Sequence, residues 1–232
     1  MQVSPIINIH QPGLIDYQKA LGLQKKLFTE NLDIKIGKKE GNTTNNLFLL
    51  EHPHVYTLGN SGDKNNLLLS NELLKIKGAS FYKIERGGDI TYHGPGQLVG
   101  YPVFDLDKLD VSIKEFVYNI EEVLIGTVAH YGLHAERLEG ATGVWLDPHN
   151  SGKARKIAAI GMKISKKVSM HGFALNVNTN LDYFSYIIPC GLKDKGVTSI
   201  QKELAKEISM EEVIAVLIKE FEKVFGYSVI FK

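Results

Sequence analysis

The most distinctive stretch of the sequence is residues 86–97, which read RGGDITYHGPGQ. Four of these twelve residues are glycine, which loses more backbone freedom on folding than any other residue. The main chain there is expected to need positive φ angles or a close approach to another group. The same block carries polar side chains at Arg86, Asp89, Tyr92, His93 and Gln97. Because ligand contacts concentrate on such loops, it predicts a substrate-binding loop; a tight connection between strands, with a structural His93, is the alternative.

These residues indicate neither a nucleotide or phosphate ligand nor a metal ion. The block has neither the G-x-x-x-x-G-K-S/T pattern of a P-loop nor the G-x-G-x-x-G pattern of a dinucleotide site. His52 and His54 flank Pro53 and could approach His93, but H-P-H lacks the helical H-x-x-x-H spacing, and no acidic third ligand is evident. We therefore expect no metal site and no cofactor.

A thiol nucleophile is the second chemical candidate, because Cys190 is the only cysteine of the chain. It lies between Pro189, whose ring fixes φ, and Gly191, which permits an exposed turn. A thiol on such a corner can project into a pocket, whereas a buried, inert cysteine is the alternative. Since the ordinary thiol pKa is about 8.5 and only the thiolate attacks, a nucleophilic role requires a nearby base or cation.

Lys156 opens the small-residue segment KIAAIG, where a charged side chain is costly unless it is paired or reaches outward. With Lys153 and Arg155 it could also form a solvated basic turn. The sequence likewise does not decide the role of His171, in the segment HGFALNV. A Cys–His hydrolase that uses His93 or His171 is a further alternative, because spatial adjacency cannot be read from sequence.

Three stretches predict the helices that must position these residues: residues 16 to about 31, 112 to about 131, and 209 to 226. Ser112 and Glu115 fit a capping box, and Ser209 and Glu212 repeat the pattern. A weaker helical turn is predicted to begin at Thr198.

Strands are predicted between these helices. Residues 157–164 and 168–177 flank Ser165-Lys166-Lys167 and predict a hairpin. If the hairpin is symmetric about Lys166, Gly161 faces His171 and both small-residue segments open onto one concave surface. Further candidates are residues 47–50, 55–58, 80–84, 143–146 and 227–231. Clustered strands without strict alternation favour an α+β fold (α/β in the broad sense), with a mixed, largely antiparallel sheet and flanking helices.

Composition narrows the class of protein. At about 150 residues per domain, 232 residues leave one or two domains open. No linker rich in Pro, Gly or Ser divides the chain, and we expect one domain, 1–232. Lys plus Arg number 27 against 26 Asp plus Glu, a net charge of +1, so no nucleic-acid or membrane-surface partner is expected. The N-terminus does not resemble a signal peptide, and no apolar run approaches the 18 or so residues of a membrane span, so we expect a cytoplasmic protein.

In chain order, RGGDITYHGPGQLVGYPVFDL, KIAAIGMKI, HGFALNV and IIPCGL closely resemble the signature blocks of LipB-type lipoyl(octanoyl) transferases. GLIDYQKALGLQ and EHPHVYTLG resemble the N-terminal pattern of that family, so the resemblance extends from about Gly13 to Ser199. It implies a fold like the catalytic domain of biotin and lipoate protein ligases. It also implies octanoyl transfer from octanoyl-acyl carrier protein to a lysine of lipoyl domains, in the E2 subunits of 2-oxoacid dehydrogenases and the glycine-cleavage H protein.

The resemblance also assigns roles to residues. The acyl-enzyme cysteine of the family falls on Cys190, and its pKa-lowering lysine falls on Lys156. Its substrate-binding blocks fall on Arg86, Gly87, Gly88, Asp89, Ile90, Thr91, Tyr92, His93, Ala159, Ile160, Gly161, Gly172, Phe173 and Ala174. We further expect His171 and Gly191 to orient the substrate or bind an oxyanion, and Ala158, Ala159 and Ala174 to leave room for the acyl chain. Residues 147–155 look individual to this chain.

Two other functions suit the same fold. An ATP-dependent lipoate or biotin protein ligase activates its acid as an adenylate and needs no cysteine. A non-catalytic module would only bind lipoyl domains.

Overall fold

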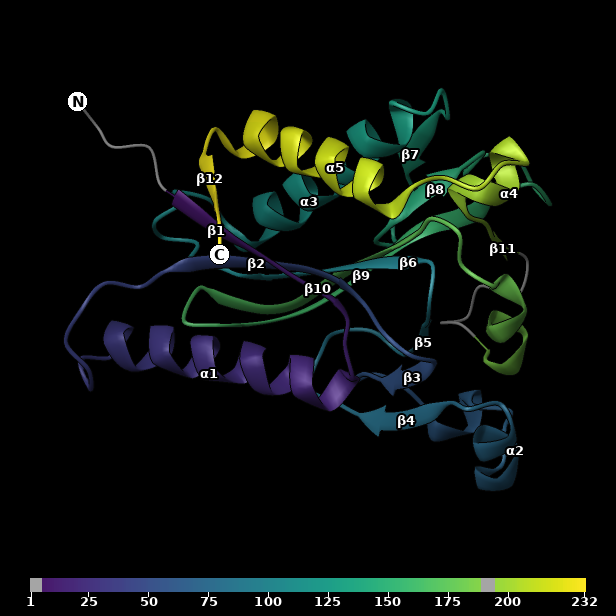
Figure 1. Ribbon diagram of the computed structural model, residues 1–232, viewed down its shortest axis with the longest axis horizontal. Coiled ribbons are helices and arrows are strands. Elements are labelled where there is room, and N and C mark those ends of the chain that lie inside the picture. Colours follow the sequence, from purple (N-terminus) through teal and green to yellow (C-terminus); the bar gives the residue numbers. More distant parts are fainter. Residues whose placement is uncertain (1–5, 189–194) are drawn as a thin grey trace.

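The computed structural model describes residues 6–188 and 195–232, and Figure 1 shows them as two helical layers on either side of a large sheet. The helices α3 (Ile113–Ala129) and α5 (Met210–Phe225) cover one face, and α1 (Tyr17–Lys35) covers the other. The short helices are α2 (Asn71–Ile76), α4 (Ile200–Leu204), and the 3-10 helices η1 (Lys64–Asn66) and η2 (Leu181–Tyr186). None of the helices in the described ranges combines the length and apolar character that a bilayer span requires.

The large sheet has the strand order β12-β1-β2-β6-β10-β9-β8-β7, and β11 pairs with β9. Its strands are β1 (Ile6–Leu14), β2 (Asn45–Glu51), β6 (Gln97–Val103), β7 (Ala135–Arg137), β8 (Val144–Leu146), β9 (Arg155–Ser165), β10 (Val168–Asn176), β11 (Gly196–Val197) and β12 (Ser228–Phe231). The small sheet has the order β4-β3-β5, from β3 (Val55–Leu58), β4 (Ser80–Lys83) and β5 (Ile90–His93). In the large sheet, each neighbouring pair along the order from β2 to β7 is antiparallel. The parallel pairings are those of β1 with β2 and β12, of β11 with β9, and of β3 with β4 in the small sheet. The predicted mixed, largely antiparallel α+β fold is confirmed.

Helix ends follow the local sequence signals. The Ser112 hydroxyl accepts from the Glu115 N–H, and the Glu115 side chain accepts from the Ser112 N–H, so the predicted capping box is confirmed. Helix α5 ends at Gly226 in the left-handed conformation (φ +69°), as expected of a glycine past the last turn. The turn predicted from Thr198 begins one residue later, because the Ser199 hydroxyl accepts from the Lys202 N–H.

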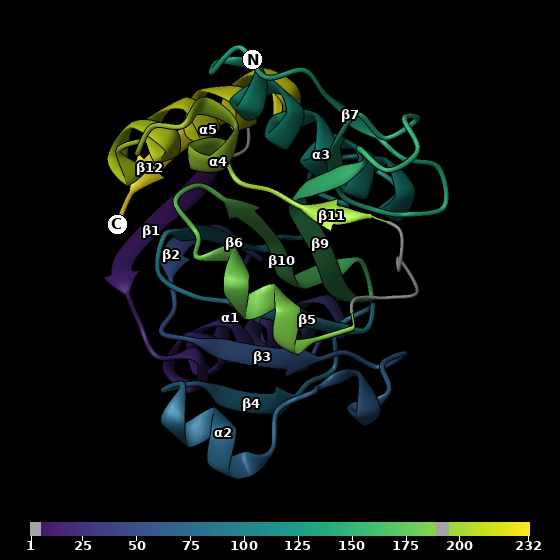
Figure 2. The same ribbon diagram turned by 90° about the vertical axis from the view of Figure 1, so that its right-hand side faces the viewer.

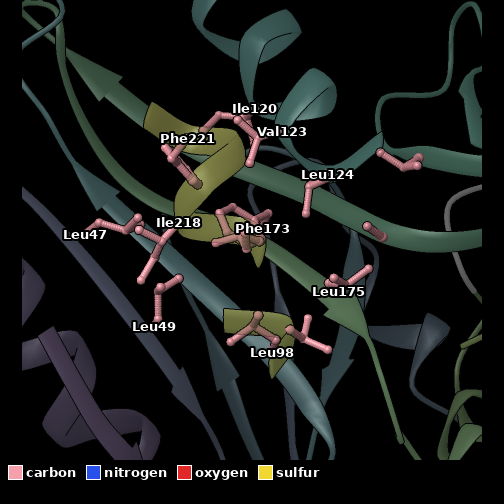
Figure 3. Packing of buried hydrophobic residues seen from close by; sticks show 14 of the residues in the cluster. Leu47, Leu49, Leu98, Ile120, Val123, Leu124, Phe173, Leu175, Ile218 and Phe221 are labelled. Carbon is pink, nitrogen blue, oxygen red and sulfur yellow. The ribbon is translucent and has the colours of Figure 1, made fainter. Parts of the chain in front are cut away.

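The core explains why β2 and β10 are almost entirely buried. On one face, sheet residues such as Leu47, Leu98 and Phe173 pack against Ile120 of α3 and Phe221 of α5 (Figure 3). On the other face a second cluster joins α1 to the same strands, and it includes Tyr17, Phe28, Val99 and Ala174. A sheet covered on both sides presents apolar residues at successive positions rather than at alternate ones.

The β9–β10 hairpin is tighter than predicted. Its loop is Lys166-Lys167, with φ of 47° and 58°, and Ser165 pairs with Val168. Positive φ at both residues is the type I′ geometry that suits strand twist. Because two residues form the loop, Gly161 pairs with Gly172, and the predicted pairing with His171 is wrong by one residue.

Candidate active site

The glycine-rich block that the sequence singles out is a loop only in part. Residues 90–93 form β5, whose Ile90 and Tyr92 are buried against β3, and Gln97 begins β6. Along ITYH only Thr91 is half-buried, and the other three residues are buried. Residues 94–96 connect β5 to β6, and the other part outside the strands belongs to the connection between β4 and β5, residues 84–89. We call this connection the substrate loop, after its predicted role.

Arg86 is the centre of the substrate loop, and its side chain is only 7% exposed. The guanidinium donates from Nη2 to the Thr57 carbonyl oxygen at 2.6 Å and to Thr57 Oγ1 at 3.0 Å. Nη1 donates to the Gly87 carbonyl oxygen at 2.9 Å, and the Gly87 N–H donates to the Met162 carbonyl oxygen at 2.9 Å. The planar fork of donors therefore holds the substrate loop against β3, while Gly87 holds it against β9.

Two cavities lie beside this loop, with volumes of about 400 and 660 Å³ including their mouths. The first cavity is lined by Tyr17, Ile84, Arg86, Thr91, His93, Tyr101, Ala159, Ile160, Gly161, His171, Gly172, Phe173 and Ala174. The second cavity is lined by Arg86, Gly88, Asp89, Ile90, Thr91, Trp145, Lys156, Ala159, Ile160, Phe184, Ile187, Lys195, Gly196 and Val197. Arg86, Thr91, Ala159 and Ile160 belong to both linings, so the two cavities adjoin along β9.

Most of the predicted substrate-binding residues line one of these cavities, and two do not. Gly87 is bonded to the backbone of β9, and Tyr92 is fully buried in the small apolar cluster behind β5. Phe173 contributes to the first lining, while its ring packs 6.2 Å from that of Phe221 on the α5 side. Ala158 is 1% exposed and belongs to the same α5-side core, so the expectation that it leaves room for an acyl chain is wrong.

The hairpin register explains the small residues of the first cavity. Ala159 pairs with Ala174 and Gly161 with Gly172, so these four residues share the face towards α1. Gly172 is required there, because a Cβ would lie 2.1 Å from the Gly100 carbonyl oxygen. His171 beside it has φ +60°, a strained conformation for a residue within a strand.

The histidines around the first cavity are neutral at ordinary pH. Burial lowers the pKa of His93 to about 3, and burial together with the Arg86 charge lowers the pKa of His171 to about 3. Burial also lowers the pKa of His52 to about 4. His52 Nδ1 lies 2.7 Å from the Ile15 carbonyl oxygen and must donate, so its Nε2 accepts from the Tyr101 hydroxyl at 2.8 Å.

Lys156 lines the second cavity. Its Nζ lies 4.6 Å from the centre of the Trp145 ring and donates to the Thr142 carbonyl oxygen at 3.2 Å. Arg155 has different surroundings, because it is paired with Glu203 at 2.6 Å. Lys156 therefore lies against a ring face and a backbone carbonyl, whereas Arg155 is in an ion pair.

Three predicted residues cannot be placed in this geometry. Pro189, Cys190 and Gly191 lie outside the described residues. The residues on either side, Ile187 and Lys195, both line the second cavity with Lys156.

The lining or supporting residues that were not predicted from the sequence include Tyr17, Thr57, Tyr101 and Trp145. Tyr17 belongs to α1, Thr57 to β3, Tyr101 to β6 and Trp145 to β8. No spacing pattern marks such residues, because they come from separate elements that only the fold brings together.

Comparison with known proteins assigns this arrangement to a family. Residues 16–222 match the lipoyl protein ligase A/B catalytic domain. An octanoyltransferase from Christiangramia forsetii is 52% identical over 224 residues, covering 94% of this chain and 95% of the relative. One from Parabacteroides distasonis is 52% identical over 218 residues, covering 94% and 97%. A bipartite lipoate protein ligase from Thermoplasma acidophilum has a TM-score of 0.67 at 18% identity, covering 100% of this chain and 86% of that chain.

The chain therefore belongs to the lipoyl protein ligase A/B catalytic domain family. The predicted enzyme class, an acyltransferase of the octanoyltransferase type, is confirmed by these relatives. The distant ligase structure confirms the predicted fold.

Proposed function

We propose that the chain transfers an octanoyl group from octanoyl-acyl carrier protein to a lysine of a lipoyl domain, through a thioester on Cys190. The observation that carries this proposal is the pair of adjoining cavities along β9. Lys156 lines one of them, small residues lie along the shared wall, and aromatic and histidine side chains line the other. A slot of this kind suits a short apolar chain with a reactive carbonyl at one end.

The acyl chain would lie over Ala159 and extend into the first cavity, between the faces of Ala174 and Gly172. Burial of six methylenes would contribute about 5 kcal/mol, at about 0.8 kcal/mol for each group. His171 and His93 line only the first cavity and Lys156 only the second. We therefore assign His171 to orienting the chain, and the oxyanion to the backbone N–H of Gly191.

In the first step, the Cys190 thiolate would attack the carbonyl carbon of the donor thioester. A bond from Sγ to carbon forms, the carbon–sulfur bond to the carrier breaks, and the Lys156 ammonium gives its proton to the departing thiolate. A nearby ammonium favours the ionised thiol before the attack. The step leaves an acyl-enzyme and a neutral Lys156.

In the second step, the amine of the acceptor lysine would attack the acyl-enzyme carbonyl. Lys156 takes the proton that the amine loses as the amide bond forms, and Sγ leaves as thiolate. The ammonium and thiolate are then restored. Covalent catalysis of this type divides one difficult transfer into two easier steps.

Intact-mass spectrometry tests the proposal directly. The protein is mixed with octanoyl-acyl carrier protein alone, and a mass gain of one octanoyl group is expected; Cys190→Ala should show none. Adding a lipoyl domain should move that mass to the acceptor without ATP. A wild-type protein with no gain would indicate a binding module, and transfer that needs ATP but not Cys190 would indicate a ligase. Release of octanoate without acceptor would indicate a thiol hydrolase.

A further inference from the structure

The described part of the segment that leads to Cys190 comprises η2 and the two residues after it, Ile187 and Ile188. This part is held in place by residues that do not all belong to the cavity lining. Figure 2 shows η2, in light green, lying beside β5 of the small sheet. This position brings η2 against the strand that follows the substrate loop.

Two rings from distant parts of the chain form a platform under η2. His54 Nδ1 lies 2.8 Å from the Tyr92 hydroxyl, and the two rings are inclined by only 18° with centres 6.1 Å apart. The Tyr183 ring of η2 lies 4.1 Å from His54 at 7° and 5.0 Å from Tyr92 at 13°. Since all three rings are nearly parallel, Tyr183 stacks across the hydrogen-bonded His54–Tyr92 pair, which we call the aromatic platform.

The platform gives a reason for one residue of the glycine-rich block. A Cβ on Gly94 would lie 1.9 Å from the Tyr92 hydroxyl oxygen. Only glycine lets this hydroxyl reach His54 at that position. The neighbouring Tyr56 adds a direct contact to the η2 backbone, because its hydroxyl donates to the Tyr183 carbonyl oxygen at 2.9 Å.

Asn66 connects the same segment to the substrate loop. Its carbonyl oxygen accepts from the Ile188 N–H at 2.8 Å, and Leu67 pairs with Ile187 in an antiparallel bridge. The Asn66 side-chain amide donates to Asp89 Oδ2 at 2.5 Å. Asp89 lines the second cavity, and its Oδ1 accepts from the Ile90 N–H. One residue therefore contacts both the end of the cysteine-bearing segment and the loop that faces the substrate.

We propose that Tyr183 and Asn66 are positioning residues, which hold the segment leading to Cys190 in register with the substrate loop. The inference rests on the proposed function in one respect, that Cys190 is the nucleophile. Tyr183 lines neither cavity and needs no contact with the acyl group. It acts through Phe184 and Ile187, neighbours in η2 and after it, which do line the second cavity.

The test compares Tyr183→Leu, which removes the stacking ring, with Tyr183→Phe, which keeps the ring and removes only the hydroxyl bond to the Lys77 carbonyl oxygen. With saturating octanoyl-acyl carrier protein, the single-turnover acylation rate should fall at least tenfold in Tyr183→Leu and less than twofold in Tyr183→Phe. Misplacement of a reacting group by about 1 Å can cost as much as 10²-fold. The thermal midpoint serves as the control for folding.

A second measurement is independent of acyl transfer. Cys190 is the only thiol, so alkylation by iodoacetamide reports on it alone. Its pH profile should shift towards that of an ordinary thiol, about 8.5, in Tyr183→Leu and remain unchanged in Tyr183→Phe. Asn66→Ala, which keeps the aromatic stack, should give a smaller shift in the same direction.

Unchanged acylation and alkylation in folded Tyr183→Leu would overturn the inference, as would an equal loss in Tyr183→Phe. If wild-type protein is never acylated, the proposed function fails. The alkylation profiles then still decide whether Tyr183 positions the thiol.

Discussion

The two walls of the cavities are held in different ways. The β9–β10 hairpin is positioned by backbone pairing along eight consecutive residue pairs, from Val168–Ser165 to Leu175–Ala158. The substrate loop has no such ladder. It is held by scattered backbone bonds, such as those from Asn60 N–H to the Arg86 carbonyl oxygen and from Gly87 N–H to the Met162 carbonyl oxygen. Side chains add to them, chiefly Arg86 on Thr57 and Asn66 on Asp89. We therefore expect changes in the hairpin to affect the stability of the fold more than changes in the loop side chains do.

The largest expected effect is on the hairpin. Gly172→Val places a branched side chain where even a Cβ lies 2.1 Å from the Gly100 carbonyl oxygen and 2.6 Å from Pro102 Cδ. We expect loss of about 3 kcal/mol or more of unfolding free energy, measured by urea denaturation. Gly22→Ala in α1 is the control, since no atom lies within 4 Å of its added Cβ. A stable Gly172→Val protein would contradict the backbone account of this wall.

A smaller effect on stability, with a large effect on catalysis, is expected at the loop. Arg86→Leu removes the donors to Thr57 and leaves its buried carbonyl oxygen without them. We expect kcat/KM for octanoyl transfer to fall about 100-fold because the loop is misplaced, while the protein stays folded. Lys163→Gln, which removes a partly exposed ion pair with Glu85 and a cation–π contact with Phe28, should change kcat/KM less than twofold. Equal losses in the two variants would contradict the specific role of the guanidinium.

The buried histidines around the first cavity predict that the free energy of unfolding depends on pH. Each has a lower pKa folded (about 4 for His52, about 3 for His93 and His171) than unfolded, so the unfolded chain binds more protons in acid. The histidines therefore contribute their full share of the free energy of unfolding above about pH 6.5. This contribution declines as the pH falls towards the folded pKa values of about 4 and about 3. By pH 5 the loss is about 2 kcal/mol for each histidine.

Urea denaturation between pH 7 and pH 5 measures this decline. The variant His171→Asn tests the contribution of one histidine, and asparagine is suitable because it tolerates the positive φ at that position. In this variant the decline between pH 7 and pH 5 should be smaller by about 2 kcal/mol. An unchanged slope would show that His171 is not held neutral.

Local signals along the chain predicted much of the fold. Ser112, Ser209 and Gly226 mark helix ends because their side chains or backbone satisfy nearby orphaned groups, whatever the rest of the molecule does. The predicted helix start at Thr198 and the predicted hairpin register were each wrong by one residue. Ser199 caps the helix instead, and two residues with positive φ form a tighter loop than the sequence suggested.

The sequence by itself determined which chemical groups are available, one thiol, a lysine before a small-residue strand and a glycine-rich block, and it determined their order along the chain. Only the tertiary structure decided that Ala159 faces the cavity while Ala158 faces the core, because one residue of register exchanges the faces of a strand. It also decided that His54, Tyr92 and Tyr183 stack together. Those rings lie up to 129 residues apart, and packing between separate elements has no counterpart in local sequence spacing.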